Sequence, residues 1–181
     1  MAKKIIGLTG ETGSGKDSFC DYIKENYRKV FCFRFSEPLT EVLKIFFDSV
    51  KKEDQQWLGS VLRSRFGNNI LGEAIIKKIK NIEDGIIILN GIRAESESEM
   101  IKNMGGKIVY ITADSKIRWQ RVQSRKEKAD DGVPYEKFLE MEKAATESFI
   151  SQISKTADCK IDNNNSKELF YQEIKKIIDL T

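Results

Sequence analysis

The sequence predicts an α/β domain of three layers, in which a five-stranded parallel sheet carries helices on both faces. Short apolar runs alternate with segments of helical period along its 181 residues, and this alternation is typical of parallel strands joined by right-handed crossovers. The first apolar run is followed at once by a glycine-rich loop and a helical segment. The length suits a single domain over residues 1–181, and no internal repeat suggests a second.

Five short runs rich in apolar and β-branched residues are the expected strands, and they cover residues 5–9, 30–35, 85–90, 107–111 and 159–161. The run 85–90 is apolar until Asn90, which favours a central strand buried on both faces. Helices are expected where apolar residues recur every three or four positions, over 19–27, 38–47, 57–62, 69–80, 94–104, 115–125, 135–154 and 166–178. Pro38 fits the first turn of its helix, with Ser36 as the N-cap.

Composition excludes several classes of function. The formal charge is 31 − 28 = +3 with both signs interspersed, which predicts no nucleic-acid partner, and no apolar run is long enough for a membrane span. The chain has no histidine, so Ser-His triads and histidine metal sites are excluded. The cysteines are odd in number and lack metal-like spacing, which favours reduced thiols in a cytoplasmic protein. A monomer and a homodimer both remain open.

The strongest motif is the loop from Gly10 to Ser18. It matches the phosphate-binding pattern G-x-x-x-x-G-K-[ST] at every position but the last, where Asp17 replaces the hydroxyl residue. Glycines let backbone N–H groups surround a phosphate, and the following helix N-terminus adds partial positive charge. The fold expected is therefore that of the P-loop NTP hydrolases, with ATP held by Glu11, Thr12, Gly13, Ser14, Gly15, Lys16, Asp17 and Ser18.

Two arginines point to a lid over this nucleotide. Arg121 and Arg125 are spaced i, i+4 on a helix that enters the polar, turn-rich segment 126–134. We interpret this segment as a lid whose arginines close on the nucleotide and the transferring phosphate, although a solvated basic helix face is the alternative. Asn163 follows the last strand, where contact with a purine base and a turn before the final helix are both open.

Three further residues are candidates for binding an acceptor. Arg93 follows the buried strand in Asn90-Gly91-Ile92-Arg93, at the edge of a parallel sheet where ligands bind. Arg63 follows an apolar helical stripe, and it binds an acceptor phosphate or makes surface salt bridges. Glu37 follows the second strand, and it orients an acceptor hydroxyl or complements the dipole of its helix. The extra helices over about 36–82 form the expected acceptor-binding insertion.

These residues together resemble the P-loop nucleoside monophosphate kinase group over nearly the whole chain. Gly7-Leu8-Thr9-Gly10 is similar to dephospho-CoA kinases and to archaeal adenylate-kinase-like proteins, whereas Lys16-Asp17-Ser18 resembles the G-K-D-[ST] ending of phage-type deoxynucleoside monophosphate kinases. Phe35-Ser36-Glu37-Pro38-Leu39, and Asn90-Gly91-Ile92-Arg93 with Glu97 and Glu99, look like the acceptor segments of the group. The ending with Ile161, Asn163 and Ser166 resembles an adenine-side loop.

The resemblance implies an ATP- and Mg²⁺-dependent transfer of the γ-phosphate to a nucleoside or deoxynucleoside monophosphate. It implies that Lys16 binds the β- and γ-phosphates, Arg121 packs near adenine, Arg125 stabilises the transferring phosphoryl group and Arg93 holds the acceptor. Asn90 stands where many relatives have Asp, and phage-type kinases share Asp17, so Asp17 is the expected metal-side residue; a carboxylate that complements the helix dipole is the alternative. Two alternatives stay open: a hydroxyl kinase of the dephospho-CoA kinase type, and a nucleotide-binding switch or regulatory ATPase without a small acceptor.

Overall fold

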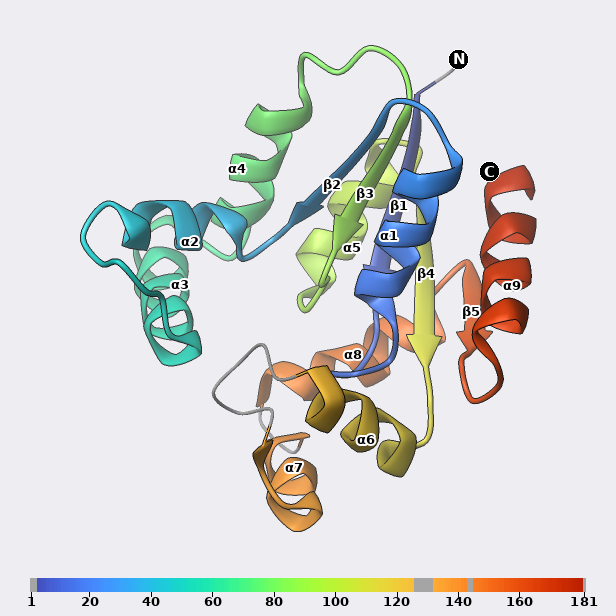
Figure 1. Ribbon diagram of the computed structural model, residues 1–181. Helices are drawn as coiled ribbons and strands as arrows, with labels where there is room; N and C mark the ends of the chain where they lie inside the picture. Colours follow the sequence, from blue (N-terminus) through green and yellow to red (C-terminus); the bar gives the residue numbers. More distant parts are fainter. Residues whose placement is uncertain (1–2, 126–131, 143–144, 181) are drawn as a thin grey trace.

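Five parallel strands form one sheet at the centre of the molecule (Figure 1). The computed structural model describes residues 3–125, 132–142 and 145–180. The strands are β1 (Lys4–Thr9), β2 (Val30–Arg34), β3 (Ile86–Asn90), β4 (Lys107–Thr112) and β5 (Cys159–Asp162), and their order across the sheet is β2-β3-β1-β4-β5. The register pairs Leu8 of β1 with Asn90 of β3 and Arg34 of β2 with Asn90. The expected α/β fold with a five-stranded parallel sheet is thus confirmed.

Helices cover both faces of the sheet and make it the middle of three layers (Figure 1). They are α1 (Lys16–Asn26), α2 (Glu37–Lys44), α3 (Lys52–Phe66), α4 (Ile70–Ile79), α5 (Glu95–Asn103), α6 (Ser115–Arg125), α7 (Tyr135–Glu142), α8 (Ala145–Lys155) and α9 (Lys167–Leu180). No helix in the described part of the chain is long and apolar enough to cross a membrane.

Alternate residues of the central strands enter two separate cores. Ile6, Leu8 and Ile88 pack with Phe19 of α1 and Ile174 of α9 on one face. The residues between them enter the second core, where the sheet meets α4, α5 and α8; its members include Ile5, Ile87, Leu89, Ile75, Ile101 and Ile153. Burial on both faces explains why the run 85–90 is apolar without alternation.

Two of the helices between β2 and β3 differ in extent from those expected; α3 is longer at both ends and finishes at Phe66, four residues late. α3 begins at Lys52, five residues before the expected start, because Lys, Glu and Gln favour helix without any apolar period and Glu53 and Asp54 complement the helix dipole in the first turn. α2 ends at Lys44, three residues early. Beyond it Ile45 and Phe46 are 76% and 72% exposed, so no buried stripe extends the helix there.

One helix was expected over 135–154, but the structure has two. α7 packs beside α6, where its Phe138 lies under the guanidinium of Arg118, 5.7 Å from the ring centroid. α8 packs beside α5 and β1 and buries Ile150 and Ile153 in the core. The two segments have the same helical period but different partners, which the period does not reveal.

Candidate nucleotide-binding site

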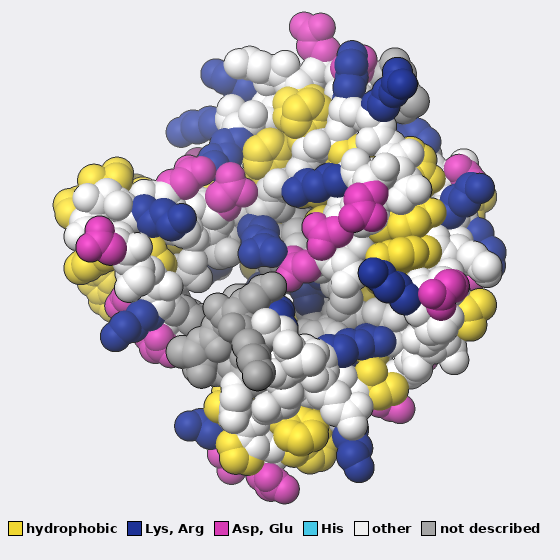
Figure 2. Space-filling view, in the orientation of Figure 1, with side chains coloured by type: hydrophobic (Ala, Val, Ile, Leu, Met, Phe, Trp, Pro, Cys, Tyr) yellow, Lys and Arg dark blue, Asp and Glu magenta, His cyan; other side chains and the backbone are white. Residues whose placement is uncertain are grey.

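A large cavity opens at the carboxyl ends of β1, β2 and β3. Its volume is about 2060 Å³, and it extends from the glycine-rich loop to α2, α3 and the start of α5. Figure 2 shows the hollow between the lobe formed by α2 and α3 and the rest of the molecule, with Lys and Arg side chains along it. The predicted site residues that line it are Thr12, Gly13, Gly15, Lys16, Asp17, Ser18, Glu37, Arg63, Arg93, Arg121, Arg125 and Asn163.

Two glycines of the loop show why close packing requires this residue. Gly13 has φ +80°, and a Cβ there would lie 2.6 Å from the backbone oxygen of Arg118. Gly15 has φ +112°, and its Cβ would lie 2.4 Å from Asn163 Nδ2. Both values are in the left-handed region that other residues rarely adopt. The loop is therefore seated on α6 and on the segment after β5.

Lys16, the first residue of α1, folds back over the loop. Its Nζ donates hydrogen bonds to the backbone oxygens of Gly10 at 2.6 Å and Glu11 at 2.8 Å, and to Ser14 Oγ at 3.4 Å. The ammonium therefore lies at the mouth of the loop, where an anion bound by the loop meets it. A lysine in this position acts on outer phosphates as a mobile cation.

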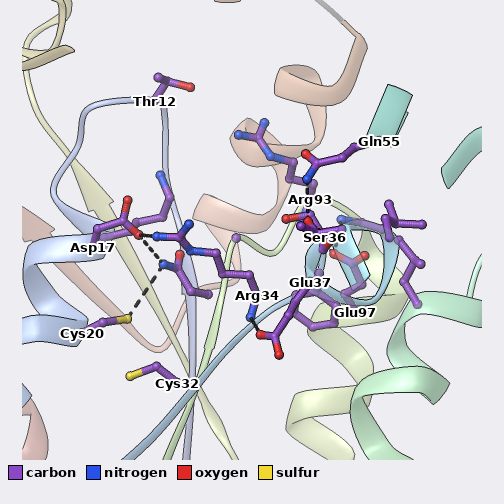
Figure 3. A pocket seen from close by; sticks show the side chains of 18 of the residues that line it. Thr12, Asp17, Cys20, Cys32, Arg34, Ser36, Glu37, Gln55, Arg93 and Glu97 are labelled. Carbon is purple, nitrogen blue, oxygen red and sulfur yellow. Dashed lines mark hydrogen bonds and ion pairs between the residues drawn. The ribbon is translucent and has the colours of Figure 1, made fainter. Parts of the chain in front are cut away.

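Asp17 is held by two neighbouring strands. Arg34 Nη2, at the end of β2, and Asn90 Nδ2, at the end of β3, donate to the same oxygen, Asp17 Oδ1, at 2.8 and 2.9 Å (Figure 3). Burial by itself raises the pKa of Asp17, but Arg34, Lys16 and the hydrogen bonds outweigh it and hold that pKa below its usual value. Asp17 is thus ionised at neutral pH, and its side chain is 51% exposed.

The site can accommodate Mg²⁺ on the donor side. Both donors to Asp17 use Oδ1, and no hydrogen bond or ion pair occupies its Oδ2 among the described residues. Mg²⁺ prefers oxygen ligands and is usually held by one or two carboxylates together with substrate phosphates. A single ionised carboxylate next to a phosphate loop fits this pattern, and the described residues contain no closed cluster of three metal ligands that would favour another ion.

Arg121 and Asn163 together form one wall beside the loop. Arg121 Nη2 donates to the backbone oxygen of Asn163 at 2.9 Å, and Asn163 Nδ2 donates to the backbone oxygen of Ser14 at 2.8 Å. Arg121 Nη1 is buried without a hydrogen-bond partner among the described residues, and burial lowers the pKa of this guanidinium. Arg125 lines the same cavity one turn further along α6. The expected lid falls mostly on residues 126–131, which lie outside the described part of the chain.

Arg118 lies on α6 and has a structural function. It is 6% exposed, donates through Nε to the backbone oxygen of Ala113 at 2.8 Å and through Nη1 to that of Thr12 at 3.2 Å, and pairs with Glu142 of α7. Its charge is therefore used to hold α6, α7 and the loop together.

Glu37 and Lys78 form an ion pair on the acceptor side. Lys78 of α4 donates to Glu37 Oε1 at 2.8 Å and pairs also with Glu41, while the backbone N–H of Arg34 donates to Glu37 Oε2 at 3.3 Å. Burial raises the pKa of Glu37, but these hydrogen bonds outweigh it and leave the pKa lowered. Both oxygens of this carboxylate thus anchor α2 to β2 and α4.

Arg63 and Arg93 meet at Glu97 on the first turn of α5. Glu97 is 2% exposed, and its Oε2 accepts the backbone N–H groups of Arg93 at 2.8 Å and Ala94 at 3.2 Å. Its Oε1 lies 3.7 Å from Arg63 Nη2 and accepts no hydrogen bond from any described residue. Burial raises the pKa of Glu97 despite the lowering effect of these partners. Glu97 therefore joins the two arginines that the sequence suggested for the acceptor.

Two predicted donor residues do not line the cavity. The side chain of Glu11 points to β4, where Tyr110 Oη donates to Glu11 Oε1 at 2.6 Å. Ser14 is fully buried and supports Lys16 through its hydroxyl. Sequence reasoning also missed Arg34, although a charged residue that ends the run Val30–Arg34 at the ligand edge of the sheet was a usable signal.

Comparisons with known proteins show the family and the fold. A family model described as an AAA domain (AAA_18) matches residues 6–145. UPF0200 proteins of Saccharolobus islandicus and Sulfurisphaera tokodaii are similar to this chain, with 24% and 26% identity; the alignments cover 97% of this chain in both cases and 93% and 96% of those proteins.

Solved structures of similar fold include two kinases. Shikimate kinase from Acinetobacter baumannii, in complex with shikimate, aligns with a TM-score of 0.60 and 15% identity over 98% of this chain and 92% of that one. Dephospho-CoA kinase from Campylobacter jejuni aligns with a TM-score of 0.52 and 18% identity over 98% and 96%. At this level of identity the likeness shows the fold alone, which is that of a P-loop kinase-like domain.

Proposed function

The chain belongs to this family of AAA domains with a kinase-like P-loop, and we propose that it is an ATP-dependent phosphotransferase acting on a nucleoside or deoxynucleoside monophosphate. The observation that carries the proposal is a single cavity lined at one end by the phosphate loop with Lys16 and at the other by Arg63 and Arg93. Phosphoryl transfer needs cations and in-line positioning more than covalent chemistry by the protein. A cavity with cationic groups at both ends meets this need.

On the donor side, the loop N–H groups and Lys16 bind the β- and γ-phosphates of ATP in this proposal. Arg121 and Asn163 form the nucleotide wall, and the buried Nη1 of Arg121 supplies a hydrogen-bond donor that no described residue uses. Arg125, one turn further on, stabilises charge on the transferring group. When bound, Mg²⁺ neutralises developing negative charge on the phosphates, and Asp17 would hold it through Oδ2.

On the acceptor side, Arg63 and Arg93 bind the acceptor phosphate. The state of Glu37 favours a phosphate over a hydroxyl acceptor, because a phosphate oxygen is already ionised and needs no general base. Glu37 makes a poor base, since its oxygens are engaged by Lys78 and by the backbone of Arg34 and its pKa is lowered.

The test is a coupled assay for ADP release with ATP, Mg²⁺ and each common NMP and dNMP in turn. We expect one or a few of these to be phosphorylated, and Lys16→Met to lower the turnover by on the order of 10²-fold or more, as removal of a stabilising charged donor does elsewhere. If none is phosphorylated, the monophosphate-kinase proposal is wrong.

A hydroxyl acceptor is the second candidate, supported by the position of Glu37 directly after β2 and by the likeness in fold to shikimate and dephospho-CoA kinases. It predicts that Glu37→Gln abolishes turnover of a hydroxyl substrate such as dephospho-CoA. A monophosphate kinase would keep most of its activity in this variant. ATP hydrolysis that no small acceptor accelerates would instead indicate a regulatory ATPase.

A further inference from the structure

Two thiols face each other directly below the Asp17 cluster. Cys20 lies on α1 and is 6% exposed, and Cys32 lies on β2 and is half-buried. Cys32 packs against the core cluster that contains Cys20, and Figure 3 shows the two sulfur atoms next to each other. Both residues line the cavity that contains the phosphate loop. Small molecules that enter this cavity therefore reach the thiol pair.

The pair forms the second of two links between α1 and β2. Asp17 and Cys20 are one helical turn apart on α1. Cys32 and Arg34 are two residues apart on β2 and therefore lie on the same face of the strand. The first link is the ion pair of Asp17 with Arg34, and the second is the contact of Cys20 with Cys32. Asn90 joins the two, because its Nδ2 donates to Asp17 Oδ1 at 2.9 Å and lies 3.8 Å from Cys20 Sγ. A change at the thiols is thus transmitted to the carboxylate.

We propose that Cys20 and Cys32 are a site of reversible oxidative modification, where a hydroperoxide converts the two thiols into a disulfide that lowers nucleotide turnover. The effect on turnover rests on the proposed function, whereas formation of the disulfide does not. Cys159, the third cysteine, lies on β5 and has no such partner among the described residues.

The electrostatics assign different roles to the two sulfurs. Its interaction with the neighbouring Cys20 thiol lowers the pKa of Cys32, against the opposing effect of burial, and Lys24 and Arg34 lower it further. The same interaction and burial raise the pKa of Cys20. The thiolate is the nucleophile in thiol oxidation. Cys32 therefore reacts first, and Cys20 is the resolving thiol that keeps its proton until the second step.

The two steps balance with hydrogen peroxide as the only oxidant. The Cys32 thiolate attacks one peroxide oxygen, the O–O bond breaks, and hydroxide leaves with the proton lost from the thiol, so that Cys32 becomes a sulfenic acid and one water is released. The sulfur of Cys20 then attacks that of Cys32, the S–O bond breaks, and the departing hydroxide takes the Cys20 proton as a second water. Two thiols are oxidised to one disulfide while one peroxide is reduced.

A disulfide at this site constrains the start of α1. It brings the two sulfur atoms to about 2.05 Å, closer than any non-bonded contact between two thiols. Asp17 lies on the first turn of α1 and the phosphate loop directly precedes that turn, so the closer approach of α1 to β2 displaces both. A misplacement of about 1 Å can cost on the order of 10²-fold in rate.

The test treats the whole protein with hydrogen peroxide, removes the peroxide and counts thiols after denaturation. We expect the number of free thiols to fall from three to one, and mass spectrometry of the digest to find Cys20 joined to Cys32 with the loss of two hydrogen atoms. The melting temperature should rise by roughly 6–12 °C for a short closed loop in a chain of this size. Turnover should fall at least about tenfold and recover with dithiothreitol.

Two variants give matched controls, each compared with its own reduced form. Cys159→Ser should keep the full response to peroxide, and Cys32→Ser should lose both the cross-link and the fall in turnover. Survival of all three thiols, or a cross-link that involves Cys159, would overturn the proposal. A Cys20–Cys32 disulfide that leaves turnover and ATP-analogue affinity unchanged would overturn its regulatory part. If the reduced protein phosphorylates no acceptor, the proposed function fails, while the thiol count and the affinity remain measurable.

Discussion

This chain carries Asp17 and Asn90 where the usual motif has a hydroxyl residue and a strand-end carboxylate. The substitution Asn90→Asp tests this arrangement. The amide that donates to Asp17 Oδ1 at 2.9 Å then becomes a second carboxylate. A hydrogen bond to a charged group contributes about 1.5–3 kcal/mol. Two like charges about 4 Å apart repel by about 1 kcal/mol in water and about 4 kcal/mol at a surface-like dielectric constant. Because the Asp17 side chain is 51% exposed, we take the lower ends and expect a loss of about 2–3 kcal/mol.

The second variant, Asp17→Ser, removes the carboxylate and its ion pair with Arg34. Exposed pairs of this kind contribute about 0.2–1 kcal/mol and the lost hydrogen bond about 1.5 kcal/mol at its lower end, so the cost is about 2 kcal/mol. The double variant combines Asp17→Ser with Asn90→Asp and so restores the hydroxyl and the strand-end carboxylate of the usual motif. It should be more stable than the sum of the single effects by about 2–3 kcal/mol, because the repulsion is gone and the hydrogen bond, which both single variants lose, is lost only once.

Urea unfolding without Mg²⁺ measures the three free energies, and the Mg²⁺ dependence of turnover is measured beside it. We expect Asp17→Ser to raise the Mg²⁺ requirement and the double variant to regain part of the loss. Asp21→Ser, the same change one turn along α1 at an exposed position, is the control and should stay within about 0.5 kcal/mol. Additive effects would refute the direct contact, and an unchanged Mg²⁺ dependence in Asp17→Ser would refute its role at the metal.

Three other changes test the walls of the cavity. Asn163→Ala removes a buried hydrogen bond to the Ser14 carbonyl and should cost about 1–3 kcal/mol in urea unfolding, whereas exposed Asn165→Ala should stay within about 0.5 kcal/mol. Burial raises the pKa of Glu97, so the folded state binds the carboxyl proton more tightly than the unfolded state. The free energy of unfolding should therefore fall as the pH rises through the folded pKa, which lies above the ordinary value of 4.5, and unfolding curves of Glu97→Gln should lack this fall. Arg121→Lys should raise the KM for ATP several-fold in steady-state assays. A lysine has a single nitrogen, which cannot take the place of Nη2 at the Asn163 oxygen and that of the buried Nη1 at the same time.

Much of the fold could be predicted because its signals are local. The continuous apolar run that ends in Asn90 identified the central strand, and the regular alternation of strand and helix identified the class. The start of α3 was missed, since its first turns consist of polar residues with high helix propensity and carry no apolar period. The division of 135–154 into α7 and α8 depends on which neighbour each segment meets, and that is a property of the tertiary structure.

In the candidate site, too, a local motif could be predicted and contacts between distant elements could not. The loop is a contiguous motif, so the sequence directly predicted Lys16 and most of the loop residues that line the cavity. Arg34 acts through Asp17, which belongs to another element, and nothing local in the sequence joins them. Glu37 was identified as a candidate, but its ion pair with Lys78 crosses 41 positions and changes how its carboxylate is interpreted. Pairings across elements are set by the register of the sheet, which a single sequence does not specify.

The hydrogen bond from Asn163 to the Ser14 carbonyl spans 149 positions and joins the segment after β5 to the loop after β1. During synthesis, the glycine-rich loop leaves the ribosome long before the residue that supports it. A nascent chain without residues beyond β4 has the phosphate-binding motif but lacks β5, Asn163 and the wall that Arg121 forms with it. The wall beside the loop is therefore complete only in chains that include Asn163. In the proposed function, bound ATP stabilises these chains against proteolysis, while chains that end before β5 gain no such protection.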